Sequence, residues 1–194
     1  MKPILLLSLA LATAATAQDI LIADFEGDTF APWQTTGTAF NAGPARGESL
    51  KSLEISSATG SGVACSENLD SGTTTGNDKP QGRLTSPEFS IQRKYIAFRI
   101  AGGDYERHAC LNLLVDGKIV KSATGRNSDA LYTASWDVSP WKGREAKIEI
   151  VDEAPGSWGH ILVDDIVQTD SPQVPPVVTT PVYQESARPL YHFT

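Results

Sequence analysis

LNLLVDGKIVKSA, residues 111–123, contains two apolar runs separated by Asp116-Gly117. The Asp-Gly pair is favoured in two-residue hairpin turns because both turn positions need a positive φ. The same period of two occurs upstream, where residues 95–101 (YIAFRIA) place Ile96, Phe98 and Ile100 on one face. These stretches predict antiparallel strands that turn one face toward a hydrophobic core.

Further short strands are expected on both sides of this hairpin. Pro87 interrupts one of them, which should therefore lie at a sheet edge or bend there. Residues 36–45 and 56–81 are rich in Gly, Ser, Thr and Asn and predict long surface loops. About eight to ten short strands with turns between them predict an all-β, antiparallel β-sandwich of jelly-roll type. The other expected strands are residues 20–25, 83–91, 135–139, 146–152 and 161–168.

Both ends of the chain differ in composition from this β-rich domain, which we place at residues 18–170. Residues 1–17 resemble a secretory signal peptide, with Lys2 before an apolar run and small residues before the expected cleavage site. The apolar run is shorter than the about 20 residues of a membrane span, so we expect a secreted or periplasmic protein without a membrane anchor. Residues 171–187 (SPQVPPVVTTPVYQESA) predict a Pro-rich linker, with a terminal edge strand as the alternative.

The charge balance is acidic, with 16 basic and 23 acidic residues and a net charge of −7. No basic stripe occurs, which disfavours nucleic acid and anionic membranes as partners. Cys65 and Cys110 are the two cysteines, and in an exported chain they are candidates for a disulfide. Two free, buried cysteines are the alternative, because spacing in the sequence does not show that the Cβ atoms meet.

The chemistry-bearing residues do not form a recognisable catalytic set. Hydrolysis of a glycosidic bond needs two carboxylates facing each other across a cleft. Asp164 and Asp165 are adjacent on an expected strand and point to opposite faces, so they cannot be that pair. No Gly-x-Ser-x-Gly elbow is present, and Gly102-Gly103 lacks the spacing of a phosphate-binding loop. The residues therefore do not predict an enzyme.

A metal site is predicted where the first and last strands should be neighbours. Asp24 and Glu26 end the first expected strand, and Asp164 and Asp165 lie in the last. Calcium prefers six to eight oxygen ligands and tolerates loose geometry. We therefore predict a structural Ca²⁺ site at these four carboxylates, with solvated or turn-capping carboxylates as the alternative. No other cofactor is expected.

Aromatic residues in polar segments are the candidates for contact with a sugar. The apolar face of a sugar ring stacks on exposed aromatics, and its hydroxyls need nearby polar groups. Segments 104–108 (DYERH) and 156–160 (GSWGH) have this composition. Trp33, Tyr105 and Trp158 are therefore the candidate glycan-binding residues, and the alternative is that each Trp fills the core.

Residues 188–194 (RPLYHFT) resemble the opening of a glycoside hydrolase family 32 catalytic domain, and they follow the Pro-rich segment directly. Further segments resemble the N-terminal β-sandwich that precedes this domain in some exported levanase- or inulinase-like proteins. These segments are residues 21–27 (LIADFEG), 84–89 (LTSPEF), 112–118 (NLLVDGK) and 158–164 (WGHILVD).

The resemblance implies a partner and a function. Family 32 enzymes are five-bladed β-propellers that hydrolyse β-fructofuranosides with retention, using an aspartate nucleophile and a glutamate acid/base. Both carboxylates would lie beyond Thr194, so no catalytic residue is assigned to residues 1–194. We expect a non-catalytic accessory module that assists the propeller by packing or by contacting fructans such as levan or inulin. A free-standing structural or adhesion-type sandwich is the alternative.

Overall fold

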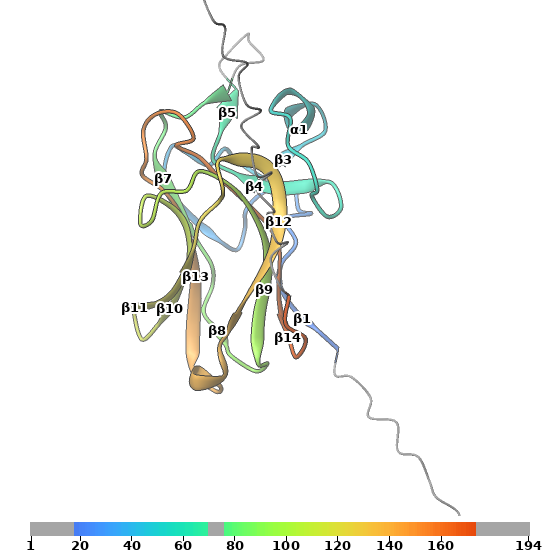
Figure 1. Cartoon of the computed structure of the whole chain (residues 1–194), viewed down its shortest axis with the longest axis vertical. Coiled ribbons are helices and arrows are strands. Elements are labelled where there is room, and N and C mark those ends of the chain that lie inside the picture. The colour runs from blue at the N-terminus through green and yellow to red at the C-terminus, as the bar shows by residue number, and fades with distance from the viewer. Residues whose placement is uncertain (1–17, 70–75, 174–194) are drawn as a thin grey trace, which may run out of the picture.

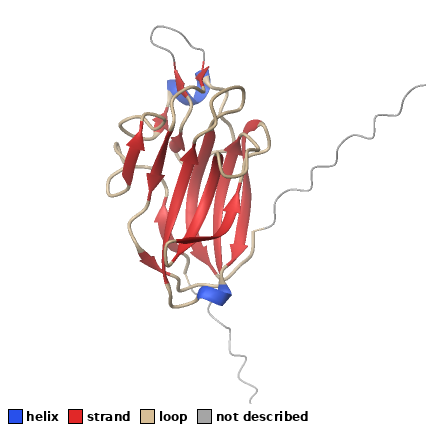
Figure 2. Ribbon diagram, turned by 90° about the vertical axis from the view of Figure 1, so that its left-hand side faces the viewer, coloured by secondary structure: helices blue, strands red, loops and turns tan. Residues whose placement is uncertain are grey.

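The computed structural model describes residues 18–69 and 76–173. The expected signal peptide, most of the expected linker and residues 188–194 lie outside this part of the chain. Two antiparallel sheets face each other, with β10, β11 and β13 in one and β9, β12 and β14 in the other (Figure 1). Strands and loops make up nearly all of the described chain (Figure 2). The predicted all-β sandwich is confirmed.

The first sheet has the order β12-β9-β14-β4-β3, and β1 also pairs with β14. Its first and last strands are therefore neighbours, as the sequence predicts. The strands are β1 (Ile20–Ala23), β3 (Ala45–Arg46), β4 (Gly62–Cys65), β9 (Tyr95–Gly102), β12 (Ser128–Asp137) and β14 (Ile161–Thr169).

The second sheet has the order β11-β10-β13-β7-β2, and β8 also pairs with β13. Its strands are β2 (Gln34–Gly37), β7 (Gly82–Thr85), β8 (Phe89–Ser90), β10 (Ala109–Val115), β11 (Lys118–Ala123) and β13 (Glu145–Asp152). The remaining elements are a small pair of strands, β5 (Asn68–Leu69) and β6 (Gly76–Asn77), the helix α1 (Glu48–Ser52) and a 3₁₀ turn (Ser139–Trp141). None of the described helices is long and apolar enough to cross a membrane.

The core lies between the two sheets and follows the alternation seen in the sequence. Ile96, Phe98 and Ile100 of β9 are almost completely buried in it, as predicted. Leu111 and Leu113 of β10 face them from the second sheet. Successive side chains of a strand point to opposite faces, so the residues between these positions belong to the outer faces.

Local turn chemistry also agrees with the sequence. Asp116 and Gly117 have φ values of 51° and 71°, as the predicted β10–β11 turn requires. The strand expected over residues 83–91 breaks into β7 and β8 around Pro87, also as predicted. At this break Ser86 keeps the sheet connected, because its hydroxyl accepts a hydrogen bond from the Ile148 amide at 2.8 Å.

Three elements differ from the predictions. The expected loop at residues 56–81 contains β4, whose four residues are all buried, as well as β5 and β6. Burial between β14 and β3 stabilises β4 although its flanks are rich in Gly and Ser. β12 begins at Ser128 rather than at residue 135, and its first half does not alternate strictly: Ser128 and Asp129 are half-buried and Ala130 is exposed. The short helix α1 is too brief to show a helical period.

The predicted disulfide between Cys65 and Cys110 is wrong, because both cysteines are free and buried. Cys65 belongs to a second apolar cluster with Leu53 and Leu162, outside the main core. On β10, Leu111 and Leu113 point into the main core, so Cys110 points to the opposite, outer face of the second sheet. The two thiols therefore lie on opposite sides of the sandwich.

Both thiols should be chemically unreactive in the folded protein. Burial raises the pKa of Cys65 and that of Cys110, and it also keeps reagents away from sulfur. We expect no reaction with Ellman's reagent under native conditions, and two reactive thiols after denaturation without a reductant. Fewer than two thiols in the denatured, unreduced protein would contradict the structure.

Candidate functional site

An open groove lies on the outer face of the second sheet. Its volume is about 680 Å³. The strands β7, β10, β11 and β13 form its floor with the side chains that alternate with the core, and the loop before β10 forms one wall. The residues that line it are Arg83, Glu106, Arg107, Asn112, Ile119, Ser122, Ala123, Thr124 and Val151.

Arg83 is the most firmly held charged group in this groove. Its Nη1 donates to Glu149 Oε2 at 2.9 Å, and its Nε and Nη2 donate to Glu153 Oε1 at 2.9 and 2.7 Å. These hydrogen bonds raise the pKa of Arg83, and the bond to Glu153 has the largest effect. A guanidinium fixed by two carboxylates keeps its planar fork in one orientation. Arg83 is therefore a preorganised polar group at the edge of the groove.

Two of the three predicted aromatic residues, Tyr105 and Trp158, lie on loops that contact each other. The Tyr105 hydroxyl donates to the Ser157 carbonyl at 3.1 Å, which joins the Tyr105 loop to the loop that carries Trp158. A side chain at Gly103 would collide with the Trp158 carbonyl, so the close approach of the loops requires glycine there. Tyr105 is 43% exposed, and Trp158 is half-buried against His160.

Trp33 is not part of this group. It is half-buried, and its ring packs on Phe25 with the ring centroids 5.5 Å apart. Phe30 continues this aromatic cluster and accepts a hydrogen bond from the Trp33 amide through its carbonyl at 2.8 Å. Trp33 is thus a packing residue at the rim of the core. This arrangement matches the alternative reading of a Trp that fills the core.

The groove continues around the edge of the sheet through shared residues. Arg83 lines the groove and also a neighbouring hollow of about 490 Å³. Glu153 and His108 line that hollow and a third one of about 290 Å³, whose wall includes Tyr105. The three hollows therefore adjoin one another from the floor of the second sheet to the Tyr105 loop, where an exposed aromatic lies.

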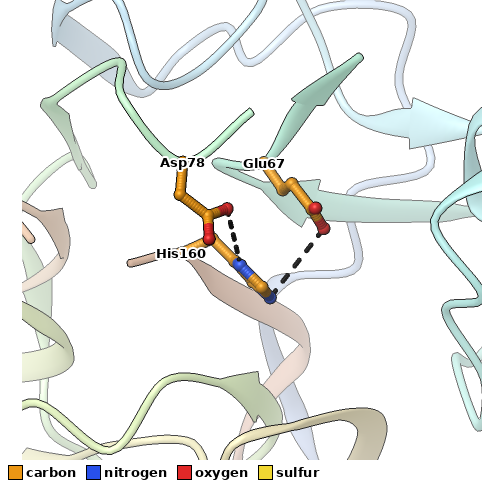
Figure 3. A group of neighbouring side chains, drawn as sticks. All are labelled: Glu67, Asp78 and His160. Atoms are coloured by element: carbon orange, nitrogen blue, oxygen red, sulfur yellow. Dashed lines mark hydrogen bonds and ion pairs between the residues drawn. The ribbon is translucent and has the colours of Figure 1, made fainter. Parts of the chain in front are cut away.

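A buried histidine supports the loop that carries Trp158. His160 lies directly before β14 and is 4% exposed. Its Nδ1 lies 2.9 Å from Asp78 Oδ1, and its Nε2 lies 2.8 Å from Asp129 Oδ1 and 3.8 Å from Glu67 Oε2. Figure 3 shows Asp78 and Glu67 approaching the ring from two separate segments. Asp78 also accepts the Gly159 amide at 3.3 Å, so the cluster fixes the backbone next to Trp158.

The buried charges in this cluster shift one another. Burial opposes the charged form of His160, but the hydrogen bonds that it donates to Asp129 and Asp78 and the charge of Glu67 raise its pKa to about 10. Burial raises the pKa of Glu67 to about 7. Burial also raises the pKa of Asp152, at the end of β13, to about 7, although the Ser66 hydroxyl partly opposes this. The folded protein therefore holds an imidazolium close to two carboxyl groups, those of Glu67 and Asp152, that are partly protonated near neutrality.

The four carboxylates of the predicted calcium site do not converge. Glu26 accepts the amides of Ser61 and Gly62 at 2.8 and 2.9 Å and the Ser61 hydroxyl at 2.7 Å, which holds its pKa near 2. Buried Asp164 accepts the Thr59 amide at 2.7 Å, and burial raises its pKa to about 6.

Glu26 and Asp164 thus hold the same loop, whereas Asp24 bonds to the Glu26 amide. In residues 18–69 and 76–173, the group of three or more ligand side chains within reach of one ion is Glu67, Asp78 and His160. The predicted grouping of all four carboxylates was wrong in its geometry. Calcium binding at Glu26 and Asp164 stays a prediction.

The sequence singled out His160 only as a neighbour of Trp158. Its carboxylate partners come from separate segments: Glu67 precedes β5, Asp78 follows β6, and Asp129 lies in β12. No spacing rule joins such residues, because the fold alone brings them together. The groove was missed for a similar reason, since its floor consists of the alternate residues of four strands.

No family model matches the sequence. Over 150 residues, or 76% of the chain, it is 38% identical to the putative glycosyl hydrolase ecdE of Aspergillus rugulosus. The match covers 20% of that protein. The chain thus resembles one fifth of a much longer relative.

Solved structures with a similar arrangement include a carbohydrate-binding module and an adhesin domain. TmCBM61, solved with β-1,4-galactotriose, is 14% identical, with a TM-score of 0.49 over 79% of this chain and 99% of that one. The K2 adhesin domain of Lys-gingipain is 16% identical, with a TM-score of 0.48 over 78% and 99% of the two chains. Both scores are below 0.5, and the two-sheet sandwich is established here by its own strand pairing.

Proposed function

We propose that residues 18–170 form a non-catalytic module with which a secreted or periplasmic glycoside hydrolase contacts its carbohydrate, and that this carbohydrate is a fructan such as levan or inulin. The observation that carries the proposal is the groove on the second sheet. It combines fixed polar groups, Arg83 and Asn112, with an adjoining loop that exposes Tyr105. Sugars are held by such combinations of directed hydrogen bonds and one stacking surface.

The relative in Aspergillus rugulosus supports the hydrolase part of this proposal. That protein is named as a putative glycosyl hydrolase, and the match covers 76% of this chain. Residues 188–194 support the fructan part, because they resemble the opening of a family 32 catalytic domain. The proposed partner is therefore a catalytic β-propeller C-terminal to Thr194. A calcium ion held by Glu26 and Asp164 would be structural.

Binding should be weak, because an open groove buries little of a small furanose ring. We expect dissociation constants of about 0.1–1 mM for fructan oligosaccharides, or about 4–5.5 kcal/mol. Tyr105→Ala should weaken binding about tenfold by removing the stacking face. Glu106→Gln, which changes a groove carboxylate without changing its size, should also weaken binding. Titration calorimetry with levan and inulin oligosaccharides measures both effects.

Leu21→Ala is the matched control, because Leu21 is an exposed apolar residue (56%) on the other sheet. Its binding should equal that of the unmodified chain. Binding of another oligosaccharide with the same sensitivity to Tyr105→Ala would retain the carbohydrate contact and reject fructan. No heat with any oligosaccharide at about 10 mM, far above the expected dissociation constant, would reject carbohydrate contact and leave a packing or adhesion role.

A further inference from the structure

The cluster around His160 holds more negative than positive charge. Three carboxylates pair with His160, namely those of Glu67, Asp78 and Asp129. Among the ion pairs of the described residues, His160 is the one cation that all three share. Ligand atoms of Glu67, Asp78 and His160 lie within 4.8 Å of one another. An ion between them would need small movements of side chains and no movement of the sheets.

A fourth carboxylate gives an independent indication. Asp152 is completely buried, and its Oδ2 has no hydrogen-bond partner among the described residues. Its Oδ1 accepts a long hydrogen bond, 3.4 Å, from the Ala154 amide, and the Ser66 hydroxyl also interacts with this carboxylate. The carboxylate lies close enough to His160 and Asp78 for their charges to act on it. A buried carboxylate oxygen without a partner is costly, and a nearby cation would offset that cost.

We propose that Glu67, Asp78 and His160 bind a divalent transition-metal ion of the Zn²⁺ type, which ties together the β5–β6 hairpin and the loop that carries Trp158. One imidazole and two carboxylates leave one position of a tetrahedral ion for water, as zinc accepts. Calcium prefers six to eight oxygen ligands and fits this set poorly.

The hydrogen bond to Asp129 supports this assignment. Metal-binding histidines usually donate their second ring N–H to a carboxylate, which orients the ring. Nε2 already lies 2.8 Å from Asp129 Oδ1, which leaves Nδ1, next to Asp78, for the metal. Glu67, whose Oε2 lies 3.8 Å from Nε2, would have to move toward Nδ1 to bind the same ion. The ion takes the place of the proton on Nδ1, and that proton is released to solvent. Asp129 is therefore the positioning residue, and Glu67 and Asp78 are the oxygen ligands.

The site differs from the calcium prediction in place and chemistry. Glu26 and Asp164 hold the Thr59–Gly62 loop and include no nitrogen ligand. The metal site is also independent of carbohydrate binding. The bound ion would fix the backbone at Gly159, beside Trp158, whether or not that surface holds a sugar.

The test uses the full chain, freed of metal with a chelator, and titrates it with Zn²⁺, Ca²⁺ and Mg²⁺ in a calorimeter. We expect one Zn²⁺ per chain, with much weaker or no binding of Ca²⁺ and Mg²⁺. Glu67→Gln, which removes one ligand and keeps its shape, should weaken Zn²⁺ binding by about tenfold or more. His108→Gln is the matched control, because His108 is exposed and outside the cluster, and its Zn²⁺ binding should be unchanged.

Co²⁺ spectra of the unmodified chain give a second readout that does not depend on any variant. We expect visible d–d absorption of a four-coordinate ion without a thiolate charge-transfer band, because Cys65 and Cys110 are not among the ligands. The proposal is overturned by the absence of Zn²⁺ binding at about 1 mM. It is also overturned by equal binding of Glu67→Gln and His108→Gln, or by a strong thiolate band.

Discussion

His160→Gln should lower the free energy of unfolding by about 3–5 kcal/mol, the largest effect of a single substitution that we expect here. The side chain of His160 is almost completely buried, and it pairs with Asp78, Asp129 and Glu67. Glutamine can replace a hydrogen bond but not the positive charge. The variant therefore leaves buried carboxylates without their cation, and it loosens the backbone that Asp78 holds at Gly159. Urea unfolding, monitored by tryptophan fluorescence, measures the loss.

The control for this loss is His108→Gln, which removes an exposed histidine from the neighbouring loop. Its stability should lie within about 0.5 kcal/mol of the unmodified chain. Similar losses in both variants would show that the buried ion pairs contribute little. Asp129→Asn offers an intermediate case, because it keeps a hydrogen-bond partner for Nε2 but removes one charge. Its loss should fall between the other two.

Stability should fall as the pH rises from about 5 to 8, with the melting temperature about 5 °C lower at the upper end. Glu67 and Asp152 have folded-state pKa values of about 7, above their ordinary 4.5 and 3.8. They retain protons in the folded state that the unfolded chain has lost, so raising the pH between these values favours unfolding. The pKa of His160 is also raised, from 6.5 to about 10. Its stabilisation is complete below the lower value and is lost as the pH rises through the higher one.

Glu26 sets the acid side of this profile. Glu26 has its pKa lowered to about 2, so its stabilising contribution is lost as the pH falls toward that value. Asp164, whose pKa is raised to about 6 by burial, adds to the loss of stability as the pH rises. Scanning calorimetry between about pH 4 and pH 9 should therefore find the highest melting temperature at the acid end of this range, near about pH 4. His160→Gln should flatten the part above about pH 7. A melting temperature that rises from pH 5 to 8 would contradict these shifts.

The sequence predicts those parts of the fold that depend on neighbouring residues. Asp116-Gly117 marks its hairpin because the turn needs positive φ at both positions, and Pro87 marks a break because it lacks an amide hydrogen. The period of two places Ile96, Phe98 and Ile100 in the core. β4 escapes prediction because only its burial between two other strands stabilises it. The sequence leaves open whether Cys65 and Cys110 are paired or free. The structure decides this, because the two side chains point to opposite outer faces of the sandwich.

The candidate site depends on residues far apart in the chain, and most of it could not be predicted. Local composition predicted the Tyr105 and Trp158 loops as candidate sugar contacts, and in the structure a hydrogen bond joins these two loops. The same criterion also selected Trp33. From the sequence alone, a Trp in a polar segment that packs on a residue such as Phe25 cannot be distinguished from a Trp that faces water. Asp78 and His160, 82 residues apart, meet only through the pairing of the sheets.

The pairing of β1 with β14 also decides how the domain responds to a pulling force. Ile20, where the chain enters β1, lies opposite Gln168, near the point where it leaves β14. Tension between the two ends would load this ladder one hydrogen bond at a time, as in opening a zipper, and not all bonds at once in shear. β1 should then peel away at low force while the rest of the sandwich stays folded. The bared edge of β14 beyond its short pairing with β4 would offer unpaired amides and carbonyls to another strand. A molecule under tension would thus expose one edge of β14 for pairing with another strand while its core is still folded.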